Sequence, residues 1–167
     1  MSDKPPRYVS WTAGKLPLPE LLEIKHRGEK IVMVTAYDAP SARLADAAGV
    51  DLILVGDSSG MVVHGRESTV PVSLDEILFM TQWVSRGAKR SIVVADMPFG
   101  SYETSNEQAV TNAVHLVKEG GADAVKVERG GTSVERAKAI VDAGIPVMGH
   151  VGLTPQTATV LGGFKAQ

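Results

Sequence analysis

Three carboxylates stand where apolar, β-branched runs of this sequence end. Asp57 follows LILVG at 52–56, Asp96 follows SIVVA at 91–95, and Glu128 closes the run AVKVE. In an α/β barrel the carboxyl ends of the parallel strands open onto a common mouth, so side chains from different strands can converge on one ligand. Because hard divalent cations favour carboxylate oxygens, three acids at such positions predict a metal site.

Lys126 and Glu128 lie two residues apart in AVKVE. Alternate residues of a strand point to the same side, so both charges are expected to enter one space while Val125 and Val127 face the other way. Taken alone, this segment is equally compatible with a structural Lys–Glu ion pair, because buried charges must be paired or bind a ligand. Together with the acids that end the two preceding strands, the pair favours a functional site. Oxygen ligands in a chain without Cys favour Mg²⁺ over zinc.

The individual residues also have structural interpretations. An isolated Asp at a strand end, such as Asp57 or Asp96, is more often a turn or helix-cap residue than a ligand. Ser58 begins a short Ser- and Gly-containing segment whose backbone N–H groups are candidates to hold an anion such as a carboxylate. His150 ends another apolar run and is a candidate to contact the ligand or to hydrogen-bond a metal-bound group, although a structural His is at least as common there. His64 falls in a long segment where a lid could form and is not assigned as a base.

The remaining polar candidates are weaker. Thr35, Tyr37 and Asp38 end the first apolar run and are candidates to line the pocket, with Asp38 equally suited to cap the next helix. His26 and His115 lie on predicted helices and are interpreted as surface residues. The Gly pairs of the sequence match neither a Walker A nor a dinucleotide fingerprint, so no nucleotide is expected.

The elements that must position these residues follow from hydrophobic periodicity and helix caps. Apolar runs predict strands at 31–36, 52–56, 91–95, 124–128 and 145–150. Helices are expected at 19–26 and near 40–48. Three further helices are expected to open with capping boxes formed by Ser73 with Glu76, Ser105 with Gln108, and Thr132 with Glu135. The near-continuous apolar character of the strands is typical of a parallel sheet covered by helices.

Two folds are compatible with this alternation of strands and helices. A closed (β/α)₈ TIM barrel needs roughly 250 residues, so this chain would be truncated after about five βα units. A flavodoxin-like open sheet fits the length better but lacks a final covering helix in the Gly- and Thr-rich segment at the end. We therefore favour a truncated barrel, with an irregular N-terminal arm at 1–16 and the N-terminal portion of one barrel domain at 17–167.

Composition limits the class of ligand and the compartment. The chain has 44% hydrophobic and 22% charged residues, and its 17 basic residues nearly balance 19 acidic ones without forming blocks. This pattern favours a small ligand over a nucleic acid or a membrane surface. The lack of Cys, of a signal peptide and of a long apolar span indicates a cytoplasmic protein.

Five motifs, taken in order and spacing, resemble the ketopantoate hydroxymethyltransferase family. They are TAYD at 35–38, VGDSSGMVVHGREST at 55–69, ADMPFGSY at 95–102, VKVE at 125–128 and GHVGLTPQ at 149–156. The resemblance spans nearly everything after residue 17. It implies a (β/α)₈ barrel of the phosphoenolpyruvate mutase and isocitrate lyase type, and a large homo-oligomer, commonly a decamer.

The resemblance also implies an activity and a role for each site residue. The family transfers a hydroxymethyl group from methylene-tetrahydrofolate to 3-methyl-2-oxobutanoate, giving 2-dehydropantoate for pantothenate biosynthesis. Asp57 and Asp96 would bind Mg²⁺, with Glu128 in its coordination sphere through water. Asp57 and Ser58 would hold the carboxylate end of the ketoacid, and Lys126 would reach it and stabilise the enolate.

One departure separates this sequence from the family pattern. The family's proton-abstracting Glu lies on a later strand, and no residue up to Gln167 matches it, so residues 1–167 alone are expected to be inactive or severely impaired. Two alternatives stay open. One is a related Mg²⁺-dependent lyase or mutase acting on another α-ketoacid. The other is a non-catalytic half-barrel that assembles with a partner supplying the remaining strands.

Overall fold

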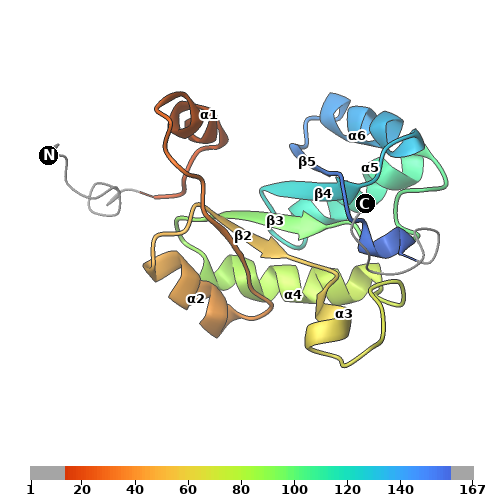
Figure 1. Cartoon of the computed structure of the whole chain (residues 1–167), viewed down its shortest axis with the longest axis horizontal. Coiled ribbons are helices and arrows are strands. Elements are labelled where there is room, and N and C mark those ends of the chain that lie inside the picture. Colours follow the sequence, from red (N-terminus) through yellow and green to blue (C-terminus); the bar gives the residue numbers. More distant parts are fainter. Residues whose placement is uncertain (1–13, 159–167) are drawn as a thin grey trace, which may run out of the picture.

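The computed structural model describes residues 14–158, which form a five-stranded parallel sheet with helices packed around it (Figure 1). The strands are β1 (Met33–Thr35), β2 (Leu52–Val55), β3 (Ile92–Asp96), β4 (Ala124–Glu128) and β5 (Val147–His150). The helices are α1 (Leu18–His26), α2 (Ala39–Ala47), α3 (Ser59–Val62), α4 (Leu74–Gly87), α5 (Asn106–Lys118) and α6 (Thr132–Asp142), and a 3₁₀ helix follows at Pro155–Thr157. Every predicted strand is confirmed, because each observed strand overlaps its predicted range.

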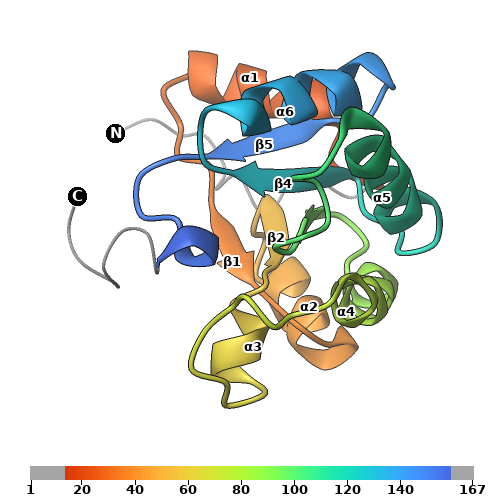
Figure 2. The ribbon, with the colours of Figure 1, turned by 90° about the vertical axis from the view of Figure 1, so that its right-hand side faces the viewer.

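Strand order decides between the two folds that the sequence left open. Each strand pairs in parallel with the next one along the chain, in the order β1-β2-β3-β4-β5. A flavodoxin-like sheet has the order 2-1-3-4-5 and helices on both faces. Here α2, α4, α5 and α6 instead follow one another around one side of the curved sheet (Figures 1 and 2). The prediction of a partial (β/α)₈ barrel is therefore confirmed, with five successive strands of its wall in place.

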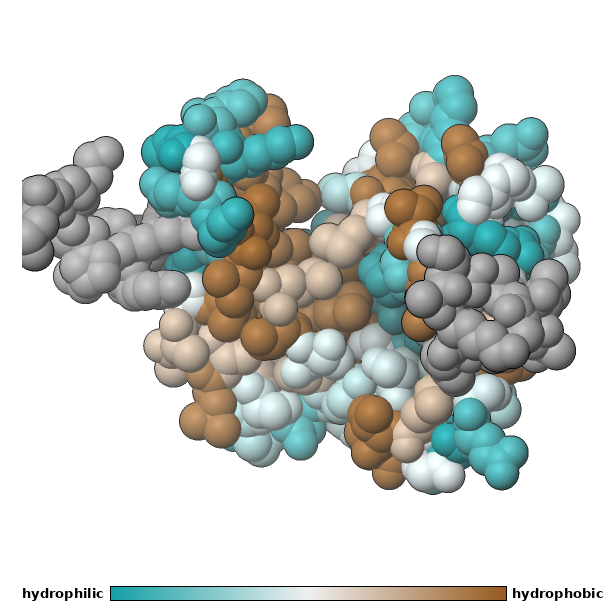
Figure 3. Space-filling model, viewed as in Figure 1, coloured by the Kyte–Doolittle hydropathy of each residue, from teal (hydrophilic) through white to brown (hydrophobic). Residues whose placement is uncertain are grey.

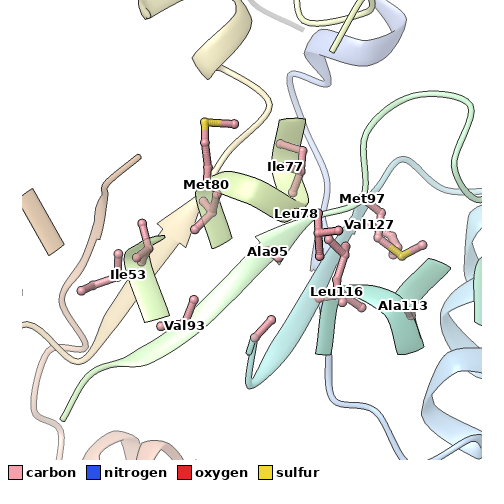
Figure 4. Close-up of a cluster of buried hydrophobic side chains, with 14 of the residues drawn as sticks. Ile53, Ile77, Leu78, Met80, Val93, Ala95, Met97, Ala113, Leu116 and Val127 are labelled. Atoms are coloured by element: carbon pink, nitrogen blue, oxygen red, sulfur yellow. The ribbon is translucent and has the colours of Figure 1, made fainter. Parts of the chain in front are cut away.

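Alternate side chains of the strands enter two apolar layers on opposite faces of the sheet. The layer under the helices joins strand residues to residues of α4 and α5, and Figure 4 shows it around Ile53, Val93, Ala95, Val127, Ile77, Met80 and Leu116. The layer on the other face contains Leu52, Ile92, Val94 and Ala124, together with Leu16. Leu18 and Leu21 of α1 pack against this second layer. Both faces of the sheet are thus covered, which explains the near-continuous apolar runs.

Two of the three serine or threonine N-caps predicted from capping boxes begin helices as expected, and one of them forms the full box. Ser73 Oγ accepts from the Glu76 N–H at 3.2 Å, and the Glu76 carboxylate accepts from the Ser73 N–H at 2.7 Å, so the full box opens α4. Ser105 Oγ accepts from the Gln108 N–H at 3.0 Å and caps α5. The Gln108 side chain, however, accepts from Thr104 instead of closing a box on Ser105. The predicted cap of α5 is confirmed, but the prediction that Gln108 bonds back to Ser105 is wrong.

The capping box predicted from Thr132 and Glu135 is also wrong. Helix α6 has Gly131 as its N-cap, with φ at +64° and no side-chain hydrogen bond. Glycine enters this left-handed region without the steric cost that a Cβ imposes, so the chain turns directly into the helix. Thr132 is then already the first helical residue and has no capping position to occupy.

Strand β1 is an apolar edge of the sheet. The side chains of Ile31, Val32, Met33 and Val34 remain 37–42% exposed. Figure 3 shows a hydrophobic band where the chain leads from α1 into β1. An unpaired apolar edge of this kind is what the incomplete barrel predicts, because closing the barrel requires another strand beside β1.

Some residues named in the predictions lie outside 14–158. The predicted arm at 1–16 falls mostly in 1–13, and the Gly162–Gly163 pair falls in 159–167. Leu16, the last residue of the predicted arm, is buried against the sheet, and its N–H donates to the Arg90 carbonyl oxygen at 2.8 Å. Between residues 14 and 158, no helix combines the length and apolar character needed to cross a membrane.

Candidate active site

The carboxyl ends of β2, β3, β4 and β5 bring the predicted site residues together. Asp96, Glu128 and His150 are the last residues of three strands, and Asp57 follows β2 by two positions. With Lys126 they line one cavity of about 480 Å³, whose other lining residues are Met33, Leu54, Ser58, Met148, Gly149, Val151 and Pro155. The predicted convergence of strand-end acids is therefore confirmed as a shared cavity.

Lys126 pairs with Asp96 across neighbouring strands. The two residues are register partners in the β3–β4 ladder, and Lys126 Nζ donates to Asp96 Oδ1. Val125 and Val127 lie in the layer under the helices, so the predicted division of AVKVE into two faces is confirmed. The alternative of a structural Lys–Glu pair is not what forms here. Inter-strand register places the ammonium beside the Asp of the adjacent strand instead.

Asp57 lies beside Asp96 in a buried position. The backbone N–H of Asp57 donates to Asp96 Oδ2 at 3.0 Å, which draws the two strand ends together. Burial, reinforced by the negative charge of Asp96, raises the pKa of the Asp57 carboxyl to about 7. Two acids held this close repel when both are ionised, so the site disfavours its own full ionisation unless a cation joins it.

Gly56 makes this close approach possible. A Cβ at position 56 would lie 2.8 Å from Ser58 Oγ and 3.3 Å from Asp96 Oδ2. Ser58 Oγ in turn shares a hydrogen bond of 2.9 Å with the Tyr37 hydroxyl. Tyr37 thus reaches the site through Ser58, whereas Asp38 caps α2 by accepting from the Ser41 N–H at 2.7 Å.

Glu128 is held by groups from two segments that follow it in the chain. His150 Nδ1 lies 2.9 Å from Glu128 Oε2, and the backbone N–H of Gln156 donates to Oε1 at 2.8 Å. His150 was predicted to contact the ligand or a metal-bound group, and the structure places it against this carboxylate. The other His candidates lie elsewhere, with His64 next to Glu76 in a separate cavity and His26 largely exposed on α1.

The donor set fits a hydrated divalent cation better than a fully coordinated one. The cavity contains the three carboxylates of Asp57, Asp96 and Glu128 and the single ammonium of Lys126. When all three acids are ionised, the negative charge that remains is the amount that one divalent cation balances. Within residues 14–158, no group of three His, Asp or Glu side chains is placed to hold a metal ion directly. Mg²⁺ suits such a site because it keeps several waters and uses one or two carboxylates.

Gln156 is a site residue that the sequence analysis missed. It lies on the 3₁₀ helix after β5 and is only 6% exposed. Its side-chain amide donates to Asp57 Oδ2 at 2.8 Å and to the Met97 carbonyl oxygen at 2.9 Å. Its one sequence signal is its place at the end of GHVGLTPQ, directly after a strand that carries a candidate His.

Known proteins with similar sequences point to one family. The family model described as ketopantoate hydroxymethyltransferase matches residues 15–167. The 3-methyl-2-oxobutanoate hydroxymethyltransferase of Moorella thermoacetica is 60% identical over 154 residues, which cover 92% of this chain and 57% of that protein. The Arabidopsis thaliana protein named 3-methyl-2-oxobutanoate hydroxymethyltransferase 1, mitochondrial, is 56% identical over 92% of this chain and 44% of its own length. The chain thus spans roughly half the length of the curated relatives it matches.

Two solved structures share the fold of this chain. A phosphonopyruvate hydrolase in complex with oxalate and Mg²⁺ matches with a TM-score of 0.64 at 16% identity, covering 86% of this chain and 53% of that one. A 2,3-dimethylmalate lyase of the PEP mutase/isocitrate lyase superfamily matches with a TM-score of 0.61 at 20% identity, covering 78% of this chain and 51% of that one. At such identities the likeness concerns the fold. The family model matches residues 15–167, and the fold builds a strand-end cavity from the residues of the shared motifs. The chain therefore belongs to the ketopantoate hydroxymethyltransferase family.

Proposed function

We propose that the complete protein transfers a hydroxymethyl group from methylene-tetrahydrofolate to 3-methyl-2-oxobutanoate, forming 2-dehydropantoate with the help of Mg²⁺. The observation that carries this proposal is the cavity in which Asp57, Asp96 and Glu128 meet beside Lys126. Its relatives of more than 50% identity bear the name of this activity. With a divalent cation bound among these carboxylates, the cavity would present the cation and Lys126 to the anionic ketoacid and its enolate.

Asp57 and Asp96 are the residues that would hold the cation directly, and Glu128 would reach it through water. When bound, Mg²⁺ supplies Lewis-acid stabilisation of the negative charge that develops on the keto oxygen during enolate formation. The hydrogen bond from the Asp57 N–H to Asp96 keeps the two carboxylates at one end of the cavity.

Lys126 is the residue of this chain that faces both the acids and the substrate space. Its ammonium bonds to Asp96 and lines the cavity, and its side chain is 12% exposed. In a site with little water, a fixed positive charge stabilises a developing oxyanion more strongly than it does in bulk solvent. Ser58 adds a hydroxyl at the same cavity, where it would bind the carboxylate end of the ketoacid. The proton-abstracting base is assigned to no residue between 1 and 167.

The test separates enolate formation from the complete reaction. The complete protein, supplied with Mg²⁺ in deuterium oxide, is expected to exchange the proton at carbon 3 of 3-methyl-2-oxobutanoate, which NMR follows directly. With methylene-tetrahydrofolate present, it is expected to form 2-dehydropantoate. Removing one preorganised charge of this kind typically costs about 10²- to 10³-fold in rate, so we expect that loss of exchange in Lys126→Met. Lys138→Met is the matched control, because Lys138 is exposed on α6, where it pairs with Asp142.

The second candidate function is a Mg²⁺-dependent lyase or mutase reaction on another α-ketoacid. The fold likeness to 2,3-dimethylmalate lyase and to phosphonopyruvate hydrolase favours it as the alternative. Cleavage of 2,3-dimethylmalate by the complete protein, without proton exchange on 3-methyl-2-oxobutanoate, would replace our proposal with this one. Turnover by residues 1–167 alone at the rate of the complete protein would contradict the prediction that the base lies further along the chain.

Assembly and location stay predictions. The family resemblance predicts a homo-oligomer, commonly a decamer, and light scattering of the complete protein measures the number of subunits. The exposed apolar edge of β1 is compatible with a half-barrel that recruits a partner, and a stable monomer of residues 1–167 would count against that alternative. The predicted cytoplasmic location is open to imaging of the tagged protein in its own cell.

A further inference from the structure

We infer that Gln156 is a positioning residue, which holds the carboxylates of Asp57 and Glu128 in the orientation that takes up a divalent cation. The inference rests on the proposed function for the presence of that cation. Gln156 contributes through hydrogen bonds to the acids and has no role as a ligand. Its position on the loop after β5 makes that loop part of the binding site.

Gln156 donates to both acids from opposite ends of the residue. The side-chain Nε2 donates to Asp57 Oδ2 at 2.8 Å, across 99 positions of sequence. The backbone N–H donates to Glu128 Oε1 at 2.8 Å. With one oxygen of each carboxylate held in this way, rotation of both groups is restrained before any ligand arrives.

The direction of the Gln156 amide is fixed by its surroundings. Nε2 faces two acceptors, Asp57 Oδ2 and the Met97 carbonyl oxygen at 2.9 Å. Oε1 faces the Tyr102 hydroxyl, which donates to it at 2.7 Å. A flipped amide would set the Gln156 oxygen against the Met97 carbonyl oxygen with no proton between them, so the Met97 carbonyl fixes the observed orientation.

Tyr102 supports this arrangement from beneath the site. Its side chain is 2% exposed, and burial raises the pKa of its hydroxyl, which therefore remains protonated and able to donate. The hydroxyl also accepts from the Glu128 N–H at 3.3 Å. The hydroxyl thus connects Gln156 to the end of β4, and through Gln156 to the acid that follows β2. Outer groups that orient metal-binding carboxylates in this way typically contribute about 10- to 100-fold to metal affinity.

Mn²⁺ binding tests the inference without any turnover. Free Mn²⁺ gives an electron paramagnetic resonance signal, so titrating the substrate-free complete protein measures the dissociation constant. Gln156→Met keeps the side-chain length and the backbone bond to Glu128 but removes the donor to Asp57, and it should bind Mn²⁺ about 10- to 100-fold more weakly. Gln82→Met is the matched control. The Gln82 amide donates to the Glu119 carbonyl oxygen at an exposed site, and its loss should leave the affinity for Mn²⁺ unchanged.

Tyr102→Phe gives a second, milder variant that keeps the aromatic ring in the core. It should weaken Mn²⁺ binding in the same direction as Gln156→Met. Because Tyr102 reaches Asp57 through Gln156, the loss of affinity in the double variant should be smaller than the product of the two single losses, whereas independent structural defects would multiply. If Gln156→Met does not fold, Tyr102→Phe decides the question alone.

The outcomes separate this inference from the proposed function. Wild-type Mn²⁺ affinity in Gln156→Met or, failing that variant, in Tyr102→Phe would overturn the inference even if hydroxymethyl transfer is found. If both variants bind Mn²⁺ more weakly but the wild-type protein does not transfer the hydroxymethyl group, the inference is supported and the proposed function is wrong. A wild-type protein that binds no Mn²⁺ would overturn the metal site and the inference together.

Discussion

Asp57 should make the stability of the metal-free protein depend on pH, and Asp57→Asn isolates that effect. In the folded protein, burial beside Asp96 raises the pKa of the Asp57 carboxyl from 3.8 to about 7. In the unfolded chain the carboxyl is hydrated and titrates near its ordinary value. Between these two values the folded protein therefore holds a proton that the unfolded chain has released.

Proton linkage gives the sign of the effect. Where the folded state binds more protons than the unfolded state, the free energy of unfolding falls as the pH rises. The contribution of Asp57 to the free energy of unfolding is complete below pH 3.8 and is lost as the pH rises to about 7. Since one pKa unit corresponds to about 1.4 kcal/mol, the rise from 3.8 to about 7 corresponds to a loss of about 4 kcal/mol.

Denaturant unfolding of the complete protein in excess EDTA measures this loss. Asn at position 57 matches the neutral carboxyl in shape and carries no charge for pH to change. Between about pH 5 and pH 8 the wild type should lose roughly 2–3 kcal/mol more stability than Asp57→Asn, because part of the titration lies below this range. Saturating Mg²⁺ at the higher pH should restore the wild type, since a cation replaces the proton between Asp57 and Asp96.

The control is Asp142→Asn, which removes an exposed carboxylate that pairs with Lys138 on the surface of α6. An exposed ion pair contributes about 0–1 kcal/mol, so this variant should keep the pH dependence of the wild type. If the free energy of unfolding in EDTA changes equally with pH in the wild type and in Asp57→Asn, the reasoning is refuted. That result would mean that Asp57 and Asp96 ionise together without a cation.

Three further substitutions test the fold and the site through stability alone, each measured by denaturant unfolding. Lys126→Met leaves buried carboxylates without their ammonium and should cost about 3–5 kcal/mol in EDTA, so a change below 1 kcal/mol would count against a buried pair. In Gly87→Ala the new Cβ would lie 2.6 Å from the Ala39 carbonyl oxygen, and we expect a loss of about 1–3 kcal/mol. Gly130→Ala, with open space around it and an ordinary φ, is the control and should be near neutral. Ser73→Ala removes the capping box of α4 and should cost about 1 kcal/mol; wild-type stability would show that water replaces the cap.

Local sequence was enough to predict the two faces of each strand. Side chains alternate across a strand whatever surrounds it, so AVKVE alone places Lys126 and Glu128 opposite Val125 and Val127. The parallel order was also predictable, because each helical segment between strands requires a crossover connection. The barrel-type strand order was not predictable from this alternation, since the same alternation also builds open sheets with other strand orders, and it is the sequential pairing of the strands that distinguishes them.

Contacts between strands and loops were not predictable from local sequence. The partner of Lys126 depends on the register between β3 and β4, which pairs it with Asp96. The neighbouring Glu128 is two residues away in sequence but bonds instead to His150, its own register partner in β5. Register comes from packing of whole strands, so a charged residue in a strand indicates a paired site without identifying the pair.

Gln156 shows why a site of this kind has components that a search for charged residues cannot find. An amide carries no charge and has several structural uses, so one Gln after a strand gives no reason to expect a functional role. Its importance arises from the fold, which sets it between the ends of β2, β3 and β4 and leaves Asp57 with a donor that does not neutralise it. A Lys at that position would cancel charge that a cation needs, whereas an amide orients the carboxylate without adding a positive charge. Because Gln156 is uncharged, the sequence offered no reason to select it as a site residue, and the same lack of charge suits it to this position.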